Sequence, residues 1–395
     1  MIKSFKYRIY PTKDQEQKLI DTLTTCRFLY NNSLSERIEK YKENKEHVNY
    51  TKQANALAEG KNKYQILVHS QVLQETLKRL DKSFQNFFRR IKERKVKAGF
   101  PRFKSEDRFN SFCYPQSGFR ITNDCKKIRL SKIGDIKIKY SREIPSKPKT
   151  CIVKRDIEQW YVVLTSEVEK KVKSSHNLKV VGIDVGITNF CTLSDGTVIE
   201  NPRTLKKSEE KLSKEQRILS KRVKGSKNRY KQRIIVSKVH RKIRNQRSDF
   251  LHKVSTDLVK KYDTIIFEDL NIKGMLKNHK LAKHISDCSW SKLIELTSHK
   301  AEEAGSEVSK VSARNTSQTC SGCGKLVPKT LADRIHICPF CGLVMDRDLN
   351  ASVNIRNRAG TARIHAHGDN VRLNEVSKDN LLSSCRRSEN PHLAV

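Results

Sequence analysis

The sequence lacks any apolar run long enough to span a membrane, and it carries no lipidation motif. Its first residues, MIKSFKYRIYP, alternate charged and apolar side chains and lack the apolar core of a secretion signal. These absences argue against a membrane protein and against an exported one. A cytoplasmic location is therefore expected.

Acidic residues are scarce relative to basic ones. The 395 residues include 81 Lys and Arg but only 43 Asp and Glu, which gives a formal net charge of +38. A chain with this excess repels itself unless a polyanion compensates it. An anionic membrane surface is disfavoured because no anchoring segment is present, so nucleic acid is the expected partner. The length predicts at least two domains.

A disulfide framework is also missing. The chain has 11 cysteines, an odd number, and most of them show no regular spacing. In a reducing compartment such residues are typical small apolar fillers. The scattered cysteines are Cys26, Cys113, Cys125, Cys151, Cys191, Cys288 and Cys385.

The other four cysteines form two Cys-x-x-Cys pairs, Cys320 with Cys323 and Cys338 with Cys341. Two such turns at this separation predict a tetrahedral site for one structural Zn²⁺ ion. Disulfides are the alternative, disfavoured in a reducing compartment, and a redox Cys-x-x-Cys would not occur in duplicate. His336 lies inside this module, and we expect it at the surface rather than as a fifth ligand.

The N-terminal part of the chain changes its hydrophobic period twice. Residues 3–10 alternate as a half-buried strand, and a helical region then extends to about residue 98. From 109 to about 169 the pattern is one of short strands. We therefore predict a small β-barrel or sandwich that includes 3–10, with the helices inserted between its first and second strands.

A third pattern begins near residue 178. A predicted hairpin comes first, and long basic helices follow over 203–262, with a break near Gly225. An apolar strand over 264–267 ends in Glu268 and is followed by a further helix and strand. After Arg356 the chain becomes polar and aperiodic, which predicts a mobile tail.

Two acidic residues stand where a buried strand would not normally tolerate them. Asp184 and Glu268 each follow an apolar run, where an unpaired carboxylate is unfavourable unless a cation or hydrogen bonds satisfy it. Either one alone could instead belong to a salt bridge or cap a helix. Asp346 and Asp348 stand at the start of a probable helix and could both be capping acids.

Together, carboxylates from two strands and a helix start suit the hydrolysis of phosphodiesters. Two Mg²⁺ ions can stabilise the attacking and leaving oxygens and can lower the pKa of a bound water. Mg²⁺ prefers oxygen ligands and keeps several waters, so three carboxylates suffice to hold it. This chemistry alone does not distinguish Asp346 from Asp348.

The chain resembles the OrfB/TnpB proteins of insertion-sequence elements, whose nuclease half is similar to type V CRISPR effectors. The resemblance rests on motifs that occur in order and covers most of residues 1–375. These motifs are YRIYPTKDQ, GFPRFKS, GIDVGITNFCTLSDG, NQRSDFLHKVS, FEDLNIKGM, SQTCSGCG, CPFCG and MDRDLNASVNI.

The resemblance implies an RNA-guided DNA endonuclease with an RNase H-like (RuvC) α/β core. It assigns the catalytic, Mg²⁺-binding carboxylates to Asp184, Glu268 and Asp348. The implied partners are a guide RNA and a double-stranded target DNA with one strand displaced. We expect a monomer. A transposase acting on its own element ends is the alternative enzyme, and a guide-bound DNA-binding repressor is the alternative without catalysis.

On this basis we predict five regions. They are a wedge-like β-barrel over 1–10 and 105–175, a helical recognition region over 11–104, a RuvC-like nuclease domain over 176–316 and 344–356, a zinc-ribbon-like insertion over 317–343, and a mobile tail over 357–395.

Overall fold

The computed structural model describes residues 1–93, 98–122, 124–170, 178–330 and 332–367, and side chains up to residue 359. The chain divides into two compact units of mixed α/β structure, Met1–Glu169 and Lys170–Val395. This division lies close to the boundary predicted at residues 175 and 176. Each unit has its own hydrophobic core.

Seven antiparallel strands form the sheet of the first unit, in the order β2-β6-β7-β1-β5-β4-β3. The N-terminal strand is central because β1 pairs with both β5 and β7. Among the described residues no ladder joins the end strands β2 and β3 of this sheet, for which a small β-barrel or sandwich was predicted. The strands are β1 (Ile2–Tyr10), β2 (Ser111–Tyr114), β3 (Phe119–Ile121), β4 (Lys127–Leu130), β5 (Gly134–Lys139), β6 (Thr150–Asp156) and β7 (Gln159–Glu167).

The helices of this unit are inserted between β1 and β2, as predicted. The first begins at a capping box, in which the Thr12 side chain accepts from the Gln15 backbone N–H and the Gln15 side chain accepts from the Thr12 backbone N–H. The apolar side chains Leu73, Leu77 and Leu80 of α4 are buried in steps of three and four, which is one face of a helix. The helices are α1 (Lys13–Asn44), α2 (Tyr50–Glu59), α3 (Lys63–Ile66) and α4 (Ser70–Lys92), and a short 3₁₀ turn spans Glu106–Arg108.

The second unit is built on five strands in the order β10-β9-β8-β11-β12. Strands β8, β11 and β12 run parallel, whereas β9 and β10 form antiparallel extensions of β8. These are the hairpin and the apolar strand predicted from the sequence. Their bounds are β8 (Val180–Val185), β9 (Asn189–Leu193), β10 (Val198–Glu200), β11 (Thr264–Glu268) and β12 (Glu307–Val311).

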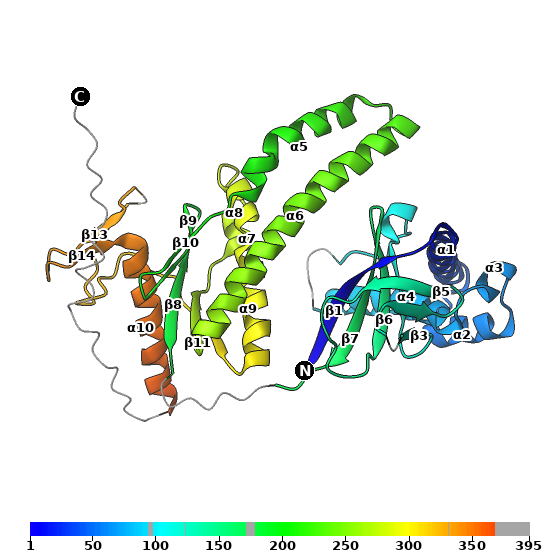
Figure 1. Ribbon diagram of the computed structural model, residues 1–395, viewed down its shortest axis with the longest axis horizontal. Helices are drawn as coiled ribbons and strands as arrows, with labels where there is room; N and C mark the ends of the chain where they lie inside the picture. Colours follow the sequence, from blue (N-terminus) through cyan, green and yellow to red (C-terminus); the bar gives the residue numbers. More distant parts are fainter. Residues whose placement is uncertain (94–97, 123, 171–177, 331, 368–395) are drawn as a thin grey trace. The chain divides into compact units, whose positions relative to one another are not determined.

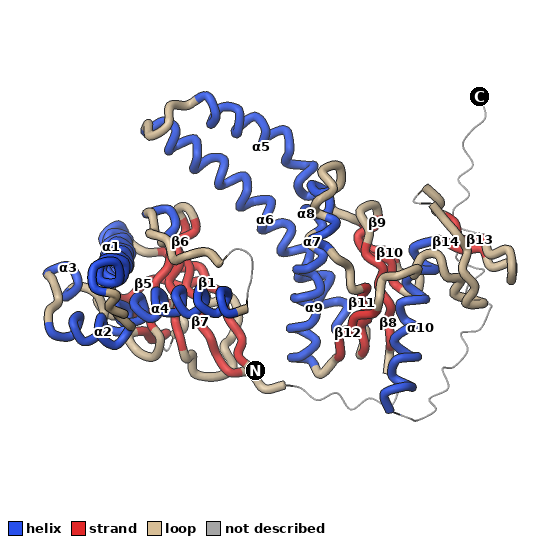
Figure 2. The backbone as a smooth tube through the Cα atoms, turned by 180° about the vertical axis from the view of Figure 1, so that it is seen from behind, coloured by secondary structure: helices blue, strands red, loops and turns tan. Residues whose placement is uncertain are grey.

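Helices cover both faces of this sheet, with α6 and α9 on one side and α10 on the other (Figures 1 and 2). Helices α5 and α6 are the predicted basic helices and lie side by side as a hairpin, and Gly225, at the predicted break, lies between them with φ +86°. The bounds are α5 (Thr204–Lys221), α6 (Lys227–Lys261), α7 (Ile272–Met275), α8 (Ala282–Cys288), α9 (Trp290–Ala304) and α10 (Arg347–His367).

Helix α10 corrects the prediction for the C-terminal end. A polar, aperiodic tail was expected from residue 357, but the helix continues to His367. The rest of the predicted tail, 368–395, lies outside the described residues. Between β12 and α10 a small module carries the strands β13 (Ile335–Ile337) and β14 (Val344–Asp346), which pair antiparallel.

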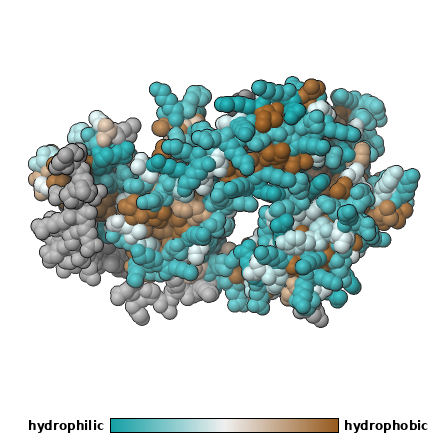
Figure 3. Space-filling model, turned by 45° about the horizontal axis from the view of Figure 1, so that its top comes forward, coloured by the Kyte–Doolittle hydropathy of each residue, from teal (hydrophilic) through white to brown (hydrophobic). Residues whose placement is uncertain are grey.

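The surface agrees with the charge of the chain. Hydrophilic side chains cover most of the face shown in Figure 3. None of the described helices is both long and apolar enough to cross a membrane.

Candidate active site and zinc site

The two strand carboxylates lie side by side. In the parallel ladder Ile183 of β8 is opposite Phe267 of β11, so Asp184 and Glu268 occupy the next level of neighbouring strands. Neighbouring strands are ~4.8 Å apart. Residues that were widely separated in the sequence therefore meet at the carboxyl ends of two parallel strands, where α/β folds bind their ligands.

Both carboxylates belong to the face of the sheet that α10 covers. Alternate residues of a strand share a face, so Asp184 faces the same way as Gly182, and Glu268 the same way as Ile266. Ile266 packs against Ile355 of α10. At Gly182 the helix is so close that an added Cβ would lie 2.2 Å from the Ser352 carbonyl oxygen. Glycine at this position is therefore what lets α10 lie against β8.

Contacts at the start of α10 distinguish Asp346 from Asp348, which residue chemistry alone could not do. The Asp346 carboxylate caps the helix, because its Oδ1 accepts from the backbone N–H of Asp348 at 2.8 Å and of Leu349 at 3.0 Å. The Asp348 carboxylate instead lies beside the Arg347 guanidinium, with Nη2 to Oδ1 at 3.1 Å. Asp346 is thus the capping acid, and the Asp348 carboxylate remains available as a metal ligand.

The charges of the other two carboxylates act on Asp184, and these three carboxylates are called the carboxylate cluster below. Burial raises the pKa of Asp184 well above its usual value, and the negative charges of Glu268 and Asp348 raise it further. Burial also raises the pKa of Glu268. A bound cation would relieve both the burial cost and the repulsion.

A ladder of polar side chains fastens α10 to the segment 312–321, which connects β12 to the cysteine module. Three residues spaced by four along the helix donate to backbone carbonyls of this connector. Arg358 Nη1 donates to Ser312 O at 2.8 Å and to Arg314 O at 2.7 Å. Asn354 Nδ2 donates to Thr316 O at 2.9 Å and to Thr319 O at 2.6 Å. Asn350 Nδ2 donates to Thr319 O at 2.8 Å.

The same connector reaches the carboxylate cluster. The Thr316 side chain lies beside Glu268 and lowers the pKa of that carboxyl against the effect of burial, while its hydroxyl donates to the Ala313 carbonyl at 3.3 Å. Asn350, Asn354 and Thr316 were not singled out from the sequence. The signal that could have found two of them is the spacing of Asn350 and Asn354, which places both amides on one face of a helix.

The four cysteines meet as predicted. Among the described residues they are the set of metal-ligating side chains whose ligand atoms all lie within 4.8 Å of one another. The Cys320 and Cys341 sulfurs are 3.6 Å apart, as are those of Cys323 and Cys338. A disulfide would need ~2.0 Å, whereas a tetrahedral Zn²⁺ with four thiolates places its sulfurs ~3.8 Å apart. The cluster therefore fits zinc and excludes the disulfide alternative.

Each Cys-x-x-Cys pair is followed by a glycine in the left-handed region, Gly324 with φ +75° and Gly342 with φ +72°. Their N–H groups donate to the carbonyls of Cys320 and Cys338 at 2.9 and 3.0 Å, which closes two similar turns. Although burial raises the pKa of the Cys338 thiol, backbone N–H donors lower it to about 6. Thiolate, the form that binds metal, is thus favoured there.

The prediction for His336 was wrong. Its side chain is fully buried in β13 and contacts the Lys329 ammonium instead of lying at the surface. Burial and the neighbouring ammonium lower its pKa. The alternation of β13 turns this residue inward while Ile335 and Ile337 are exposed, so polarity alone gave the wrong face.

Known proteins and family models match this chain along most of its length. A protein of Streptomyces pristinaespiralis named "Putative RNA-guided DNA endonuclease" is 35% identical over 98% of this chain and 96% of its own length. The chain belongs to the OrfB/TnpB family. Family models described as "Probable transposase" of the OrfB type and "Cas12f1-like, TNB domain" match residues 163–279 and 290–355 of this OrfB/TnpB chain.

Two further relatives extend the comparison. "Putative RNA-guided DNA endonuclease InsQ" of Escherichia coli K12 is 31% identical over 90% of this chain and 91% of its own length. A solved structure of "the mini-RNA-guided endonuclease CRISPR-Cas_phi3" is similar with a TM-score of 0.50 at 10% identity, over 94% of this chain and 93% of that one. At this identity the second likeness shows the fold alone.

One family description differs from the structure. A model described as "Helix-turn-helix domain" matches residues 1–46 of the OrfB/TnpB chain. In this region the structure has a strand, β1, and one uninterrupted helix, α1. The N-terminal segment therefore begins a strand-centred unit rather than a helix-turn-helix.

Proposed function

We propose that this chain is an RNA-guided DNA endonuclease that hydrolyses phosphodiester bonds with Mg²⁺ held by Asp184, Glu268 and Asp348. One observation carries the proposal: two strand carboxylates lie side by side on the sheet face that α10 covers, and α10 begins with the third. The named relatives support the RNA-guided activity.

The sheet supports an RNase H-like (RuvC) core as part of this proposal. Its central strand β8 continues into an antiparallel hairpin on one side and is flanked by parallel strands on the other. This arrangement brings Asp184 of β8 next to Glu268 of β11. The fold alone does not specify the reaction, so the hydrolytic reaction is inferred from the three carboxylates.

The residues have distinct parts in the proposed reaction. When bound, Mg²⁺ would lower the pKa of the attacking water and stabilise charge on the leaving oxygen. Asp184 on the central strand, together with Glu268 and Asp348, would hold the ions. Thr316, beside Glu268, lowers the pKa of that carboxyl and so favours its ionised, metal-binding form. The four-cysteine site would hold a structural Zn²⁺ with no open position for catalysis.

The net positive charge of the chain supports RNA and DNA as the partners of the proposed nuclease. Lys and Arg residues that neutralise phosphates would hold the guide RNA, the target strand and the displaced strand, while base pairing would supply sequence specificity. The basic hairpin of α5 and α6 is one such surface. A DNA-binding repressor would not need the carboxylate cluster.

The test begins with the RNA that co-purifies with the chain from its native host. We expect a discrete non-coding RNA whose sequence specifies the cleaved DNA in the presence of Mg²⁺. Asp348→Asn should abolish cleavage while target binding survives. The matched control, Asp346→Asn, keeps a side-chain oxygen that can cap the helix and should retain cleavage.

The contrary outcomes are distinct. Sequence-specific cleavage by the RNA-free chain would reject guidance by RNA. Equal loss of cleavage in the Asp346 and Asp348 variants would reject the assignment of the third ligand. Covalently joined element ends, instead of cut targets, would favour the transposase that the description of the family model suggests.

A further inference from the structure

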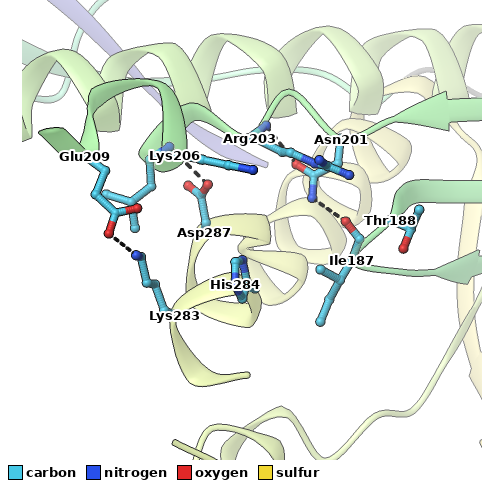
Figure 4. Close-up of a pocket in the computed structure, with 10 residues that line it drawn as sticks. Ile187, Thr188, Asn201, Arg203, Lys206, Glu209, Lys283, His284 and Asp287 are labelled. Carbon is cyan, nitrogen blue, oxygen red and sulfur yellow. Dashed lines mark hydrogen bonds and ion pairs between the residues drawn. The ribbon is translucent and has the colours of Figure 1, made fainter. Parts of the chain in front are cut away.

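A cavity of about 250 Å³ lies beyond the carboxyl end of β8, between the start of α5 and helix α8 (Figure 4). It is smaller than the ~300–1,000 Å³ of sites that enclose drug-sized ligands. It therefore suits a compact polar group such as a phosphate with part of its sugar. Neither the carboxylate cluster nor the cysteine site includes any of its lining residues.

Both acids in the lining of the cavity are already paired. Asp287 accepts from the Thr204 hydroxyl and the Leu205 backbone N–H, each at 3.0 Å, and from Arg247 at 2.6 Å. Glu209 forms an ion pair with Lys283. These contacts leave no uncompensated negative charge in the lining.

The cations Arg203 and Lys206 also line the cavity. In the segments that the structure covers, neither side chain has an acidic partner, and both are exposed at the cavity. Figure 4 shows them on one side of the cavity, with the α8 residues His284 and Lys283 on the other. The lining thus carries net positive charge, which favours an anionic ligand.

The backbone at this site is held in an uncommon conformation. Arg203 lies in the left-handed region with φ 47°, directly before α5. Asn201 supports it, because its Oδ1 accepts from the Arg203 backbone N–H at 3.0 Å and its Nδ2 donates to the Ile187 carbonyl at 2.7 Å. A non-glycine residue in this conformation persists only when its surroundings enforce it, and such residues cluster at ligand sites.

The cavity is close to the carboxylate cluster along the chain. Ile187 lines it and follows Asp184 by three residues, and because Ile187 lies in the bend after β8, the two residues are at most ~10 Å apart along the chain. A single strand of nucleic acid with a phosphate at the carboxylates can therefore place a neighbouring phosphate at the cavity. Arg binds phosphate through its forked donors, and Lys adds a point charge.

We propose that this cavity is a subsite for a backbone phosphate of the DNA strand that is cut, contacted by Arg203 and Lys206. The proposal rests on the proposed nuclease function, since it takes its ligand from there. The same chemistry would bind a phosphate of the guide RNA, and the experiment separates the two sources.

The test measures binding of a labelled five-residue oligothymidylate to the full chain with its co-purified RNA, in EDTA. Lys206→Ala should weaken binding about five- to tenfold and reduce the slope of log K against log salt by ~0.7, the value for one single-strand phosphate. Lys207→Ala, one residue further along α5 and outside the lining, is the matched control and should change binding less than twofold. Arg203→Lys should keep part of the affinity because it keeps the charge.

Acetylation of lysines, read by mass spectrometry, locates the contact. The oligothymidylate should protect Lys206 but not Lys207. Equal effects of the two lysine variants, or no protection of Lys206, would overturn the proposal. Protection of Lys206 by the co-purified RNA before any oligothymidylate is added would assign the cavity to the guide and would also overturn it. Because the assay contains no Mg²⁺ and no guided target, a failed nuclease assay leaves this result intact.

Discussion

At the scale of single residues, the negative charges of the carboxylate cluster repel one another in the metal-free protein. Asp184 is central to it, because burial and then the charges of Glu268 and Asp348 raise its pKa. An acid with a raised pKa binds its proton more tightly when folded. Protonated Asp184 therefore adds its full contribution to the stability of the folded protein below ~4, the pKa of an aspartate in the unfolded chain. That contribution is lost as the pH rises from ~4 to the higher pKa of Asp184 in the folded protein.

This sign gives a prediction for Asp184→Asn. Asparagine cannot ionise, so in EDTA the melting temperature of the variant should exceed that of the wild type at pH 8, by a few degrees, and the two should converge towards pH 4. Adding Mg²⁺ at pH 8 should raise the melting temperature of the wild type but not of the variant. Thermal melts across pH, with and without Mg²⁺, measure both effects.

Asp249→Asn is the control for this prediction. Asp249 is an exposed acid of α6 that pairs with Lys253 at 2.8 Å, far in sequence from the carboxylates. Its replacement should leave the pH dependence unchanged. If the difference in melting temperature between Asp184→Asn and the wild type were the same at every pH, repulsion at Asp184 would be contradicted.

Individual residues were predictable where their chemistry conflicts with their surroundings. Asp184 and Glu268 stand out because a charge after an apolar strand needs an explanation. Asp348 could be separated from Asp346 by resemblance, but the physical reason, the cap made by Asp346, needs the helix geometry. Thr316 gave no signal, since a threonine in a loop is unremarkable until its partner is known.

At the scale of secondary-structure elements, α10 depends on a close approach to β8. The ideal Cβ of an alanine at position 182 would lie 2.2 Å from Ser352 O and 2.5 Å from Arg356 N. Both atoms belong to the backbone, so they can move only if the helix moves. A small displacement of α10 would carry Asp348 away from the strand carboxylates.

Gly182→Ala should therefore destabilise the second unit by about 1–3 kcal/mol and weaken the binding of Mn²⁺, a paramagnetic substitute for Mg²⁺. The chain has 2 tryptophans, Trp160 in the first unit and Trp290 in the second. In a Trp160→Phe background, urea unfolding followed by fluorescence reports on the second unit, and electron paramagnetic resonance reports Mn²⁺ affinity.

The control for this prediction is Gly60→Ala. An added Cβ at Gly60 meets no atom within 4 Å, and the residue has φ −149°, which any amino acid adopts. It should leave the Trp290 transition and Mn²⁺ affinity unchanged. Unaltered Mn²⁺ binding in Gly182→Ala would show that the position of α10 does not control the metal site.

The length of α10 was underestimated for a physical reason. Part of its buried face is polar: Asn350 and Asn354 are buried and bind backbone carbonyls, as Arg358 does. A helix held in this way shows little apolar periodicity, which is the signal that sequence reasoning uses. Helix α6, by contrast, shows that periodicity, and its Val239 and Ile243 are buried.

At the scale of the whole molecule, the cysteine module and the carboxylate cluster are mechanically connected. The module is entered through the connector 312–321, which α10 binds, and it leaves through β14, which leads directly into α10. Ser321, next to Cys320, donates its backbone N–H to Asn350 Oδ1 at 2.9 Å. Both ends of the module thus reach residues that position the proposed Mg²⁺ ligands.

The overall composition predicted this level of organisation only in part. The charge of +38 indicated a nucleic-acid partner, and the change of hydrophobic period near residue 178 marked the division into units. The link between the two candidate metal sites could not be inferred, because it consists of side-chain contacts to backbone carbonyls that leave no pattern in the sequence.

This link predicts that loss of zinc impairs the carboxylate site. The wild-type chain should contain about one Zn per molecule by elemental analysis, and Cys338→Ser should remove it. Without the ion the module loosens, so Mn²⁺ affinity should fall by ~10-fold, as when supporting contacts of a metal site are lost. Cys125→Ser, which removes a thiol outside the cluster, should keep both zinc and Mn²⁺ affinity. A zinc-free Cys338 variant with wild-type Mn²⁺ affinity would show that the two sites are independent.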